Sequence, residues 1–580
     1  MINLNYPVED VKFLLTEVFS FDQRMSEIPK LSELDLDLML SVVGECEKFC
    51  NNVLLPLNST GDAEGCKFHD GQVTTPTGFP EAYKKFVENG WASLSGDVEY
   101  GGQGLSHALQ FLTDEIISAS NMSFGLFPAL TRGACEVIKL YATDEIKEKY
   151  LPNLISGEWT GVMSLTEAGA GSDLSLVTTR ANPNGDGSYK INGTKIFISS
   201  GDHDFGGNII HLVLARLPGA PSGSGGLSLF LVPKYFVSTD GEIGEKNKII
   251  VGGIETKMGI HAQPTCVLNY EDATGWLIGD AHSGLKAMFS MMNTERLFVG
   301  TQALGVAEIA YQKATDYAQE RKQGRQSLDD SNPAPIICHP DVKRMLMTIS
   351  SVNEAARALC LLTALELDKR DYHPSEAEQK EASNFVSLVT PIIKAALSDF
   401  GLESCVMAQQ VFGGHGYIHE WGMEQYVRDV RITQIYEGTN GIQSLDLITR
   451  KIFLNDAKLP FQLFEHIEAD IFEAQQFAEI DDVSQLILNS LDALDSITSK
   501  LVGLRKEPVV LQTVASDYLR LFSLVLLGWM WIKILCAVKK SSDVSEELKT
   551  GKLMKARFFA THILPSYLSL LARIQSDLKR

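Results

Sequence analysis

The stretch Gln434-Ile435-Tyr436-Glu437-Gly438-Thr439-Asn440-Gly441-Ile442-Gln443 places one acidic residue, Glu437, among apolar and small polar neighbours. A carboxylate in an apolar pocket has its charged form disfavoured, which raises its pKa and makes it a useful proton acceptor. Gly438 follows directly, and without a side chain it would let a substrate lie close to the backbone. The alternative is a plain helix N-terminus capped by Thr439 or Asn440. These ten residues alone favour the helix start, and other stretches of the chain reverse that preference.

The composition places the chain among soluble globular proteins. It has 580 residues, of which 44% are hydrophobic and 21% are charged, enough for several domains and a large buried core. The formal net charge is -22. Nucleic-acid binding is disfavoured, because phosphate backbones are bound through an excess of lysine and arginine. A local basic pocket for an anionic substrate remains compatible with this charge.

The cysteine and histidine patterns indicate neither a disulfide framework nor a metal site. Nine cysteines are scattered without a CxxC pair, so we expect a cytoplasmic protein. His415 and His419 are four residues apart, but Gly413, Gly414 and Gly416 disfavour the helix that would bring them together, and we expect no metal. The N-terminus lacks a basic region followed by an apolar run, so no signal peptide is expected.

One apolar run raises the question of a membrane span. The run from Leu521 to Ile532 is almost wholly apolar, and Lys533 interrupts it. Without interruption it is too short to cross a hydrocarbon core of about 30 Å. We therefore expect a buried bundle helix here and keep peripheral membrane contact as the lesser alternative.

The hydrophobic periodicity predicts a mainly α, α+β protein. Apolar residues recur at three and four spacing toward both ends of the chain, whereas short β-rich runs fill its middle, including the strong hairpin dipeptide Asn192-Gly193. Asp481-Asp482-Val483-Ser484 predicts a helix start, and Glu507-Pro508 predicts a helix break. We expect a helical extension over 1–34, a helical domain over 35–160, a β-barrel or sandwich over 161–280, a helical bundle over 281–450 and a further helical domain over 451–580.

A second informative stretch, Leu165-Thr166-Glu167-Ala168-Gly169-Ala170-Gly171-Ser172-Asp173, joins the first helical region to the β region. Its three small residues at 169–171 would let backbone N–H groups approach an anionic or electron-rich ligand, and Thr166 and Ser172 add hydroxyls. The stretch is not GxGxxG and opens no βαβ unit, so a Rossmann nucleotide site is not supported. Alone, such a turn is a weak signal.

Both stretches, with the segments around them, resemble the acyl-CoA dehydrogenase family over residues 35–450. The other segments that carry the resemblance are Tyr100-Gly101-Gly102-Gln103-Gly104, Lys149-Tyr150-Leu151-Pro152, Ser156-Gly157-Glu158-Trp159, Lys195-Ile196-Phe197-Ile198-Ser199-Ser200-Gly201, Glu320-Arg321-Lys322 and Gln410-Val411-Phe412-Gly413-Gly414-His415-Gly416. The family implies an N-terminal helical domain, a middle β domain and a C-terminal four-helix bundle. The long C-terminal extension and the segment from Lys257 to Cys266 most resemble the 3-methylmercaptopropionyl-CoA dehydrogenase group.

The resemblance gives Glu437 the role of catalytic base. In the family such a residue abstracts the α-proton of an acyl-CoA thioester while a hydride leaves the β-carbon for flavin N5, which gives a trans-2-enoyl-CoA. An α-proton is too weakly acidic for a carboxylate unless the developing enolate is stabilised. The family supplies hydrogen bonds to the thioester carbonyl from the base's own backbone N–H and from the flavin's ribityl chain. The implied role is fatty acid β-oxidation, with 3-methylmercaptopropionyl-CoA or a medium- or long-chain acyl-CoA as substrate.

The resemblance also implies two sets of binding residues. The FAD contacts are Met163, Leu165, Thr166, Gly171, Ser172, Phe197, Ile198, Ser199, Arg321, Gln410, Gly413, Gly414 and Thr439. The substrate contacts are Ser172, Asn293, Arg296 and Gly438. Within the family, positions like Arg321 and Gln410 approach the FAD of a neighbouring subunit, and positions like Arg296 lie near the CoA portion. The alternatives are strand core for Phe197 and Ile198 and salt bridging along a helix surface for the two arginines.

Several positions depart from the family's pattern. Ala168 stands where many relatives have proline, which costs turn rigidity but removes no contact. Asn293 stands where some carry aspartate, which puts the CoA contact there in doubt. Gly441 stands where many have glutamine, so that flavin contact is not carried over, and Gln323-Gly324-Arg325 replaces a common aromatic-glycine-lysine run.

The resemblance further implies a homodimer or a dimer of dimers that passes electrons to an electron-transfer flavoprotein. An acyl-CoA oxidase is the close alternative, because the same base and flavin serve when oxygen reaches the reduced ring. A non-catalytic or membrane-tethered binding protein that retains the fold is the second alternative. The motifs leave the acyl-chain length open.

Overall fold

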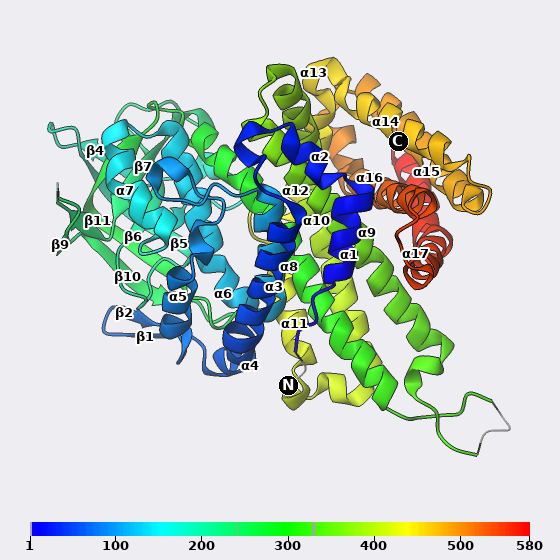
Figure 1. Ribbon diagram of the computed structural model, residues 1–580. Helices are drawn as coiled ribbons and strands as arrows, with labels where there is room; N and C mark the ends of the chain where they lie inside the picture. Colours follow the sequence, from blue (N-terminus) through cyan, green and yellow to red (C-terminus); the bar gives the residue numbers. More distant parts are fainter. Residues whose placement is uncertain (1–2, 239, 328–330, 580) are drawn as a thin grey trace. The chain divides into compact units, whose positions relative to one another are not determined.

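The computed structural model describes residues 3–238, 240–327 and 331–579, with elements labelled as in Figure 1. It divides into two compact units. Unit 1 comprises Met1–Phe49, Ser106–Ser120 and Arg296–Arg580, and unit 2 comprises Cys50–Leu105 and Asn121–Glu295. The chain passes from one unit to the other within α6 (His107–Tyr141) and α8 (Gly284–Glu320). In α6 the passage falls at Asn121, whose φ of -160° and ψ of 92° break the helical geometry.

Unit 1 is built of helices. Besides its parts of α6 and α8, its helices are α1 (Val8–Phe13), α2 (Phe21–Ser26), α3 (Leu36–Phe49), α9 (Pro340–Tyr372), α10 (Glu376–Val411), α11 (Met423–Val430), α12 (Asn440–Thr449), α13 (Leu454–Ala457), α14 (Leu459–Ala474), α15 (Asp481–Gly503), α16 (Pro508–Lys540), α17 (Glu546–Phe558) and α18 (Tyr567–Asp577). The predicted helix start at Asp481 and the predicted break at Pro508 are both confirmed. Proline fits the first position of α16 because the N–H it lacks would have no intrahelical partner there.

The apolar run near the C-terminus lies inside α16, which has 33 residues. By length and composition alone, α9, α10 and α16 are long and apolar enough to cross a membrane. In α16 the most apolar window has a mean hydropathy of 2.1, and 94% of that window is buried in the protein. A helix that is apolar all round is a core helix when other elements surround it, and α16 packs against α9, α12, α14, α15 and α18. The prediction of a buried bundle helix is confirmed, although the helix is longer than the apolar run suggested.

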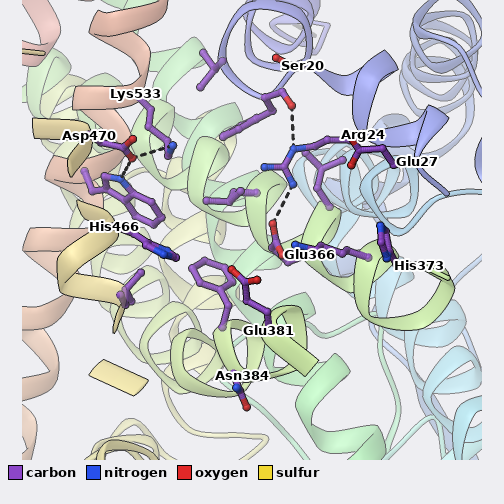
Figure 2. A pocket seen from close by; sticks show the side chains of 18 of the residues that line it. Ser20, Arg24, Glu27, Glu366, His373, Glu381, Asn384, His466, Asp470 and Lys533 are labelled. Carbon is purple, nitrogen blue, oxygen red and sulfur yellow. Dashed lines mark hydrogen bonds and ion pairs between the residues drawn. The ribbon is translucent and has the colours of Figure 1, made fainter. Parts of the chain in front are cut away.

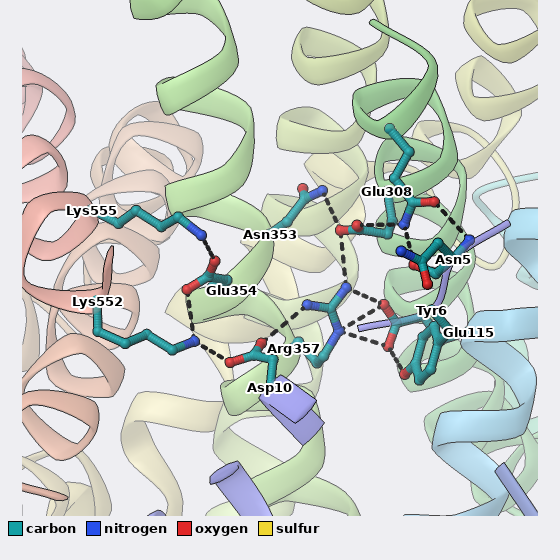
Figure 3. Close-up of polar contacts among 11 residues, drawn as sticks. Asn5, Tyr6, Asp10, Glu115, Glu308, Asn353, Glu354, Arg357, Lys552 and Lys555 are labelled. Atoms are coloured by element: carbon teal, nitrogen blue, oxygen red, sulfur yellow. Dashed lines mark hydrogen bonds and ion pairs between the residues drawn. The ribbon is translucent and has the colours of Figure 1, made fainter. Parts of the chain in front are cut away.

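A buried ionic network ties sequence-distant segments of unit 1 together (Figure 3). Its centre is Arg357 of α9, whose guanidinium lies 2.7 Å from Glu115 of α6 and 3.0 Å from Glu308 of α8. At its other end Lys552 of α17 donates to Asp10 of α1. The network holds four carboxylates and three cations: Asp10, Glu115, Glu308, Glu354, Arg357, Lys552 and Lys555. The N-terminal extension and the additional C-terminal helices are therefore both anchored to α9, the helix that carries the buried Arg357.

Unit 2 combines helices with a β-sheet. Besides its parts of α6 and α8, its helices are α4 (Leu55–Glu64), α5 (Phe79–Glu88) and α7 (Asp144–Ser156). Its strands are β1 (Lys67–His69), β2 (Gln72–Thr74), β3 (Thr160–Ser164), β4 (Arg180–Pro183), β5 (Tyr189–Ser199), β6 (Ile209–Arg216), β7 (Leu227–Pro233), β8 (Tyr235–Val237), β9 (Ile243–Lys246), β10 (Ile249–Ile254) and β11 (Thr265–Ile278). The hairpin β1-β2 lies within the segment 35–160, which the periodicity predicted as helical only.

The main sheet closes into a barrel, as predicted. Its strand order is β10-β11-β5-β4-β6-β3, and β7 pairs with both β11 and β6. The length of β11, 14 residues, allows this closure, because residues 265–275 pair with β5 and residues 276–278 pair with β7. Most pairs are antiparallel, whereas β3 and β4 each run parallel to β6. Full closure leaves fewer unpaired edges, which a small β domain would otherwise have to protect.

Two apolar cores pack against this sheet. In β6 the side chains of Ile209 and Val213 join a core made almost wholly of strand residues. The alternate residues Ile210, Leu212 and Leu214 join a second core with α6 and α7. Successive strand residues point to opposite faces, so a strand buried on both faces reads as a continuous apolar run.

The predicted hairpin at Asn192-Gly193 is wrong. Strand β5 runs unbroken through these residues, which pair with Glu271 and Tyr270 of β11. A Cβ on Gly193 would lie 2.3 Å from Oγ1 of Thr179. The glycine therefore serves the close approach of a neighbouring segment and not a turn.

Candidate active site

Phe197 projects from a bulge in β5. Cys266 of β11 pairs with Ile198 and Leu268 pairs with Lys195, so two residues of β5 stand opposite one residue of β11. Phe197 has a φ of 59°, a left-handed backbone that a residue with a bulky side chain rarely adopts. The residue is 58% exposed. A bulge re-aims a side chain, and here it turns a strand aromatic toward solvent instead of the core.

The glycine-rich turn beside Phe197 is fixed by a buried acid, Glu167. Its carboxylate accepts from the Lys195 ammonium at 2.9 Å and from the backbone N–H and hydroxyl groups of Thr178 and Thr179 at 2.6 to 3.0 Å. Burial opposes ionisation, but the Lys195 ammonium and the threonine hydroxyls hold the pKa of Glu167 at about 2. The turn is joined to β5 as well, because the N–H of Ile196 donates to the carbonyl of Thr166 at 2.9 Å.

The predicted cofactor residues of unit 2 fall into exposed and buried sets. Phe197, Gly171 and Ser172 are exposed, and Leu165, Thr166 and Ser199 are half-buried. A Cβ on Gly169 or Gly171 would meet no atom within 4 Å, so the turn presents open backbone. The side chains of Met163 and Ile198 lie in the two apolar cores, as the strand-core alternative expects for Ile198. A contact of Met163 or Ile198 with a cofactor would come from the backbone.

Glu437 sits in a turn of unit 1 with a left-handed backbone. Its φ is 55° and the φ of Gly438 is 85°. Thr439 is the N-cap of α12, and its Oγ1 accepts from the N–H of Ile442 at 3.3 Å. The helix-start interpretation of this stretch is thus confirmed, and it does not exclude the catalytic one, because the base precedes the cap. A Cβ on Gly438 would lie 2.8 Å from Nε2 of Gln443, so the position is closely packed on one side.

Burial raises the pKa of Glu437, and the positive charges of Arg296 and Lys394 oppose this rise. Arg296 is itself buried, and its Nη1 lies 3.1 Å from Asp446 of α12. This ion pair joins α8 to α12 in the interior, not along a helix surface as the alternative proposed. The CoA contact predicted for Arg296 stays a prediction, and the side chain of Asn293 lies outside those that the structure describes.

A third set of predicted residues lies at the ends of α8 and α10. Arg321, Gln410, Gly413 and Gly414 are all exposed. Around them the aromatic rings of unit 1 stack in pairs. The ring centroids of Tyr317 and Phe412 are 4.1 Å apart and those of His415 and Trp421 are 4.4 Å apart. The Tyr317 hydroxyl lies 2.9 Å from Nδ1 of His415. This surface carries the segments that the resemblance assigns to a neighbouring subunit's FAD.

A cleft of about 680 Å³ opens elsewhere in unit 1, between α2, α9, α10, α14 and α16 (Figure 2). None of the residues lining it is a predicted site residue. Two ion pairs lie within its lining: Arg24 lies 2.9 Å from Glu366, and Lys533 lies 2.9 Å from Asp470. We assign it no ligand. Among the residues that the structure describes, no group of three or more His, Cys, Asp and Glu side chains is placed to hold a metal.

Comparison with known families covers nearly the whole chain. The acyl-CoA dehydrogenase N-terminal domain matches residues 42–158, the middle domain matches 162–273 and the C-terminal domain matches 282–453. A fourth family, acetyl-CoA dehydrogenase C-terminal like, matches residues 463–579. The extra C-terminal helices therefore have relatives of their own.

Individual proteins agree with this result. The 3-methylmercaptopropionyl-CoA dehydrogenase of Ruegeria pomeroyi is 42% identical over 80% of this chain and 79% of its own length. A butyryl-CoA dehydrogenase of Syntrophomonas wolfei is 34% identical over 97% of this chain and 95% of its own length. The solved structure of Caenorhabditis elegans ACDH-11 in complex with C11-CoA shares the fold, with a TM-score of 0.78 at 20% identity over 100% of this chain and 95% of that chain.

The chain belongs to the acyl-CoA dehydrogenase family, whose members are flavin-dependent oxidoreductases acting on CH–CH bonds. The family's cofactor is FAD. The geometry of unit 2 fits it: an exposed Phe197 ring offers a face for a flat aromatic system, and the open backbone of Gly169 and Gly171 with the Ser172 hydroxyl offers polar partners.

Sequence reasoning missed the residues that support these groups. Glu167 and Lys195 stood inside quoted motifs, but nothing in their spacing, 28 residues apart, indicated a buried pair. Lys394, on α10, was not singled out at all. The one available signal was a charged residue inside an apolar run, Pro391-Ile392-Ile393-Lys394-Ala395-Ala396-Leu397, where a lysine has to find partners.

Proposed function

We propose that this protein oxidises an acyl-CoA thioester to a trans-2-enoyl-CoA with FAD as cofactor and Glu437 as the base. The observation that carries the proposal is the turn of Glu437. A single acid with a raised pKa is held in a disfavoured backbone conformation next to a glycine. Strained backbone at a titratable group is characteristic of functional sites. The family to which the chain belongs indicates the class of reaction.

In this proposal Glu437 takes the α-proton of the thioester. A carboxylate whose pKa lies above its usual range is a stronger base, and the positive charges of Arg296 and Lys394 limit the rise that burial causes. Gly438 leaves room for the thioester beside the base. FAD, when bound, supplies the acceptor for the hydride that leaves the β-carbon.

The substrate proposed first is 3-methylmercaptopropionyl-CoA, with a medium- or long-chain acyl-CoA as the alternative. Support for the first comes from the relative of that name at 42% identity. Relatives named for butyryl-CoA span more of the chain at lower identity, so short unbranched thioesters belong in the same test. Anaerobic titration of the flavin absorbance with these thioesters ranks them directly, because bleaching of the oxidised flavin reports reduction.

The decisive variant is Glu437→Gln, which keeps the shape of the side chain and removes its basicity. We expect it to retain FAD and to lose flavin bleaching by a factor of about 10⁴ or more, in the range found when an essential base is removed. Glu403→Gln, on the exposed face of α10, is the matched control and should bleach at the wild-type rate. Undiminished bleaching in Glu437→Gln would remove Glu437 from this role, and a purified protein without flavin colour would favour a non-catalytic relative.

We further propose that an electron-transfer flavoprotein reoxidises the reduced enzyme, and that the enzyme is a cytoplasmic homodimer or dimer of dimers. The exposed glycines and stacked aromatics around Gly413 support a contact with a second subunit. Stopped-flow reoxidation with air against an electron-transfer flavoprotein separates a dehydrogenase from an oxidase. Rapid reoxidation by air would support the oxidase, and sedimentation equilibrium gives the number of subunits.

A further inference from the structure

We infer that Lys394 is a positioning residue for Glu437: it clamps the turn that carries the base and places a positive charge near it. This inference rests on the proposed role of Glu437. Lys394 lies on α10, its side chain has no exposed surface, and no part of the reaction assigned above uses it directly.

The clamp consists of two hydrogen bonds from one ammonium. Nζ of Lys394 donates to the carbonyl of Gly438 at 2.8 Å and to Oδ1 of Asn440 at 3.0 Å. The first bond holds the backbone directly after the base, and the second holds the first residue of α12. The lysine thus spans the turn from Glu437 to the start of the helix.

The turn needs this support because its backbone is disfavoured. Left-handed φ values are costly for a residue with a Cβ, and Glu437 adopts one next to a left-handed glycine. Two side chains donate hydrogen bonds to the carbonyls of Glu437 and Gly438. Lys394 contacts that of Gly438, and Nε2 of Gln443 contacts those of Glu437 and Gly438 at 3.0 and 3.1 Å. Without them the turn would relax and carry the Glu437 carboxylate with it.

Two further residues of α10, Ser398 and Asp399, hold both ends of the stretch. Asn440 donates to Asp399 at 2.7 Å and to the hydroxyl of Ser398 at 2.9 Å. Gln434, before the turn, donates to the same carboxylate of Asp399 at 2.6 Å. Residues 394 and 398 are four apart and share one helix face. Among these residues of α10, Lys394 is the one that bonds to the backbone directly after the base.

The charge on Lys394 affects the base as well as its position. Burial lowers the pKa of Lys394 to about 7, opposed by Glu437 and Asp399 and reinforced by Arg296. Glu437 in turn faces Lys394 and Arg296. A cation next to Glu437 favours its ionised form, so loss of that cation raises the pH at which the base becomes active.

The test compares Lys394→Met with Lys451→Met. Lys451 is another buried lysine whose Nζ donates to a residue of α10, the hydroxyl of Ser387 at 2.7 Å, and it makes no hydrogen bond to the turn among those found. Both variants lose a buried lysine, so general destabilisation is matched. Each is purified with FAD, and the limiting rate of flavin bleaching, the acyl-CoA concentration at half-saturation and the pH profile are measured.

We expect Lys394→Met to lower the limiting rate by about 10- to 100-fold while half-saturation changes less than about threefold, because a misplaced base affects the chemical step more than binding. The acidic limb of its pH profile should move to higher pH. Amide hydrogen exchange across residues 434–443 should rise, and this readout does not depend on activity. Lys451→Met should leave all four measurements as in the wild type.

Equal losses in the two variants, or an unchanged acidic limb and unchanged exchange in Lys394→Met, would overturn the inference. That outcome is separable from failure of the proposed function. If Glu437→Gln abolishes bleaching while Lys394→Met behaves as the control, the base stands and only the lysine's role is lost. If Glu437→Gln bleaches normally, both fail together.

Discussion

The guanidinium of Arg357 and the carboxylate of Glu115 form a two-pronged buried pair, with Nη2 at 2.7 Å and Nε at 3.0 Å from the same oxygen. Both side chains are almost completely inaccessible to solvent. The network around them holds one more carboxylate than cations, and burial raises the pKa of Glu115. A neutral donor offsets part of that excess, because the Tyr6 hydroxyl donates to Glu115 at 2.7 Å.

Removing one partner of a buried ion pair leaves a charge without compensation, which typically costs about 3–5 kcal/mol. We therefore expect Arg357→Met to lower the free energy of unfolding by about that amount. The control lies on the same helix: Arg344 pairs with Asp341 at 2.8 Å on an exposed face, and such pairs contribute about 0–1 kcal/mol. Urea unfolding followed by circular dichroism measures both variants. Equal shifts for the two arginines would contradict the structural role of the network.

Glu167→Gln should weaken the flavin side of unit 2. The substitution leaves the buried Lys195 ammonium with neutral partners only, among them the carbonyl of Leu165 at 2.8 Å, and removes a hydrogen bond to a charged group, which contributes about 1.5–3 kcal/mol. The folded pKa of Glu167, about 2, lies below its ordinary value of 4.5, so its stabilising effect is present above pH 4.5 and is lost as the pH falls toward 2. The variant should therefore show a lower FAD-to-protein ratio and a flatter loss of stability in acid.

The control for Glu167→Gln is Glu64→Gln, whose carboxylate pairs with Lys67 on the surface of the same unit. It should keep the wild-type FAD content. Absorbance at the flavin and protein bands gives the ratio, and thermal unfolding between pH 3 and 7 gives the acid profile. A full complement of FAD in Glu167→Gln would show that the turn does not need its buried acid.

The fold could be predicted because the spacing of apolar residues differs between the helical and the β domains. Strand β6 is apolar except for His211 and its last residue, Arg216, and α16 contains a long apolar run, and both are buried as those patterns require. The hairpin prediction failed at Asn192-Gly193. A glycine is needed there because Thr179 approaches closely across the sheet, and not because the chain turns. A pattern of a few neighbouring residues cannot report contacts between segments that are far apart in the sequence.

The same limit applies to the site. Glu437 was singled out because its stretch resembles a motif of the family, and its role as the base stays a prediction. The bulge at Phe197 depends on the register of β5 against β11, and the clamp by Lys394 depends on a residue 43 positions before the base. Sequence indicates which groups carry the chemistry, whereas the groups that hold them in place follow from tertiary packing.

Gly438 and Gly441 provide a matched pair of substitutions in one turn. A Cβ at 438 would lie 2.8 Å from Nε2 of Gln443 in a backbone with a φ of 85°, whereas a Cβ at 441 would lie 3.8 Å from Oγ1 of Thr439, an ordinary contact. We expect Gly438→Ala to lower the rate of flavin bleaching by about 100-fold, because a displacement of about 1 Å at a reacting group has effects of that size. Gly441→Ala should stay within about twofold of the wild type. Similar rates for both variants would mean that the turn tolerates a side chain beside the base.

Lys394 also predicts a pH dependence of stability. Its folded pKa of about 7 lies below the ordinary value of 10.5, so between these values the unfolded chain binds more protons at this residue than the folded one. Its contribution to stability therefore rises with pH from about 7 to 10.5 and is lost as the pH falls through 7. Lys394→Met removes that contribution, so its melting temperature should rise less, or fall more, than that of the wild type between pH 7 and 9.5. Lys549→Met, which removes a surface lysine paired with Glu546, should follow the wild-type curve. Parallel curves for the wild type and Lys394→Met would show that Lys394 is as readily protonated in the folded protein as in the unfolded chain, and the charge beside Glu437 would then be permanent instead of titratable.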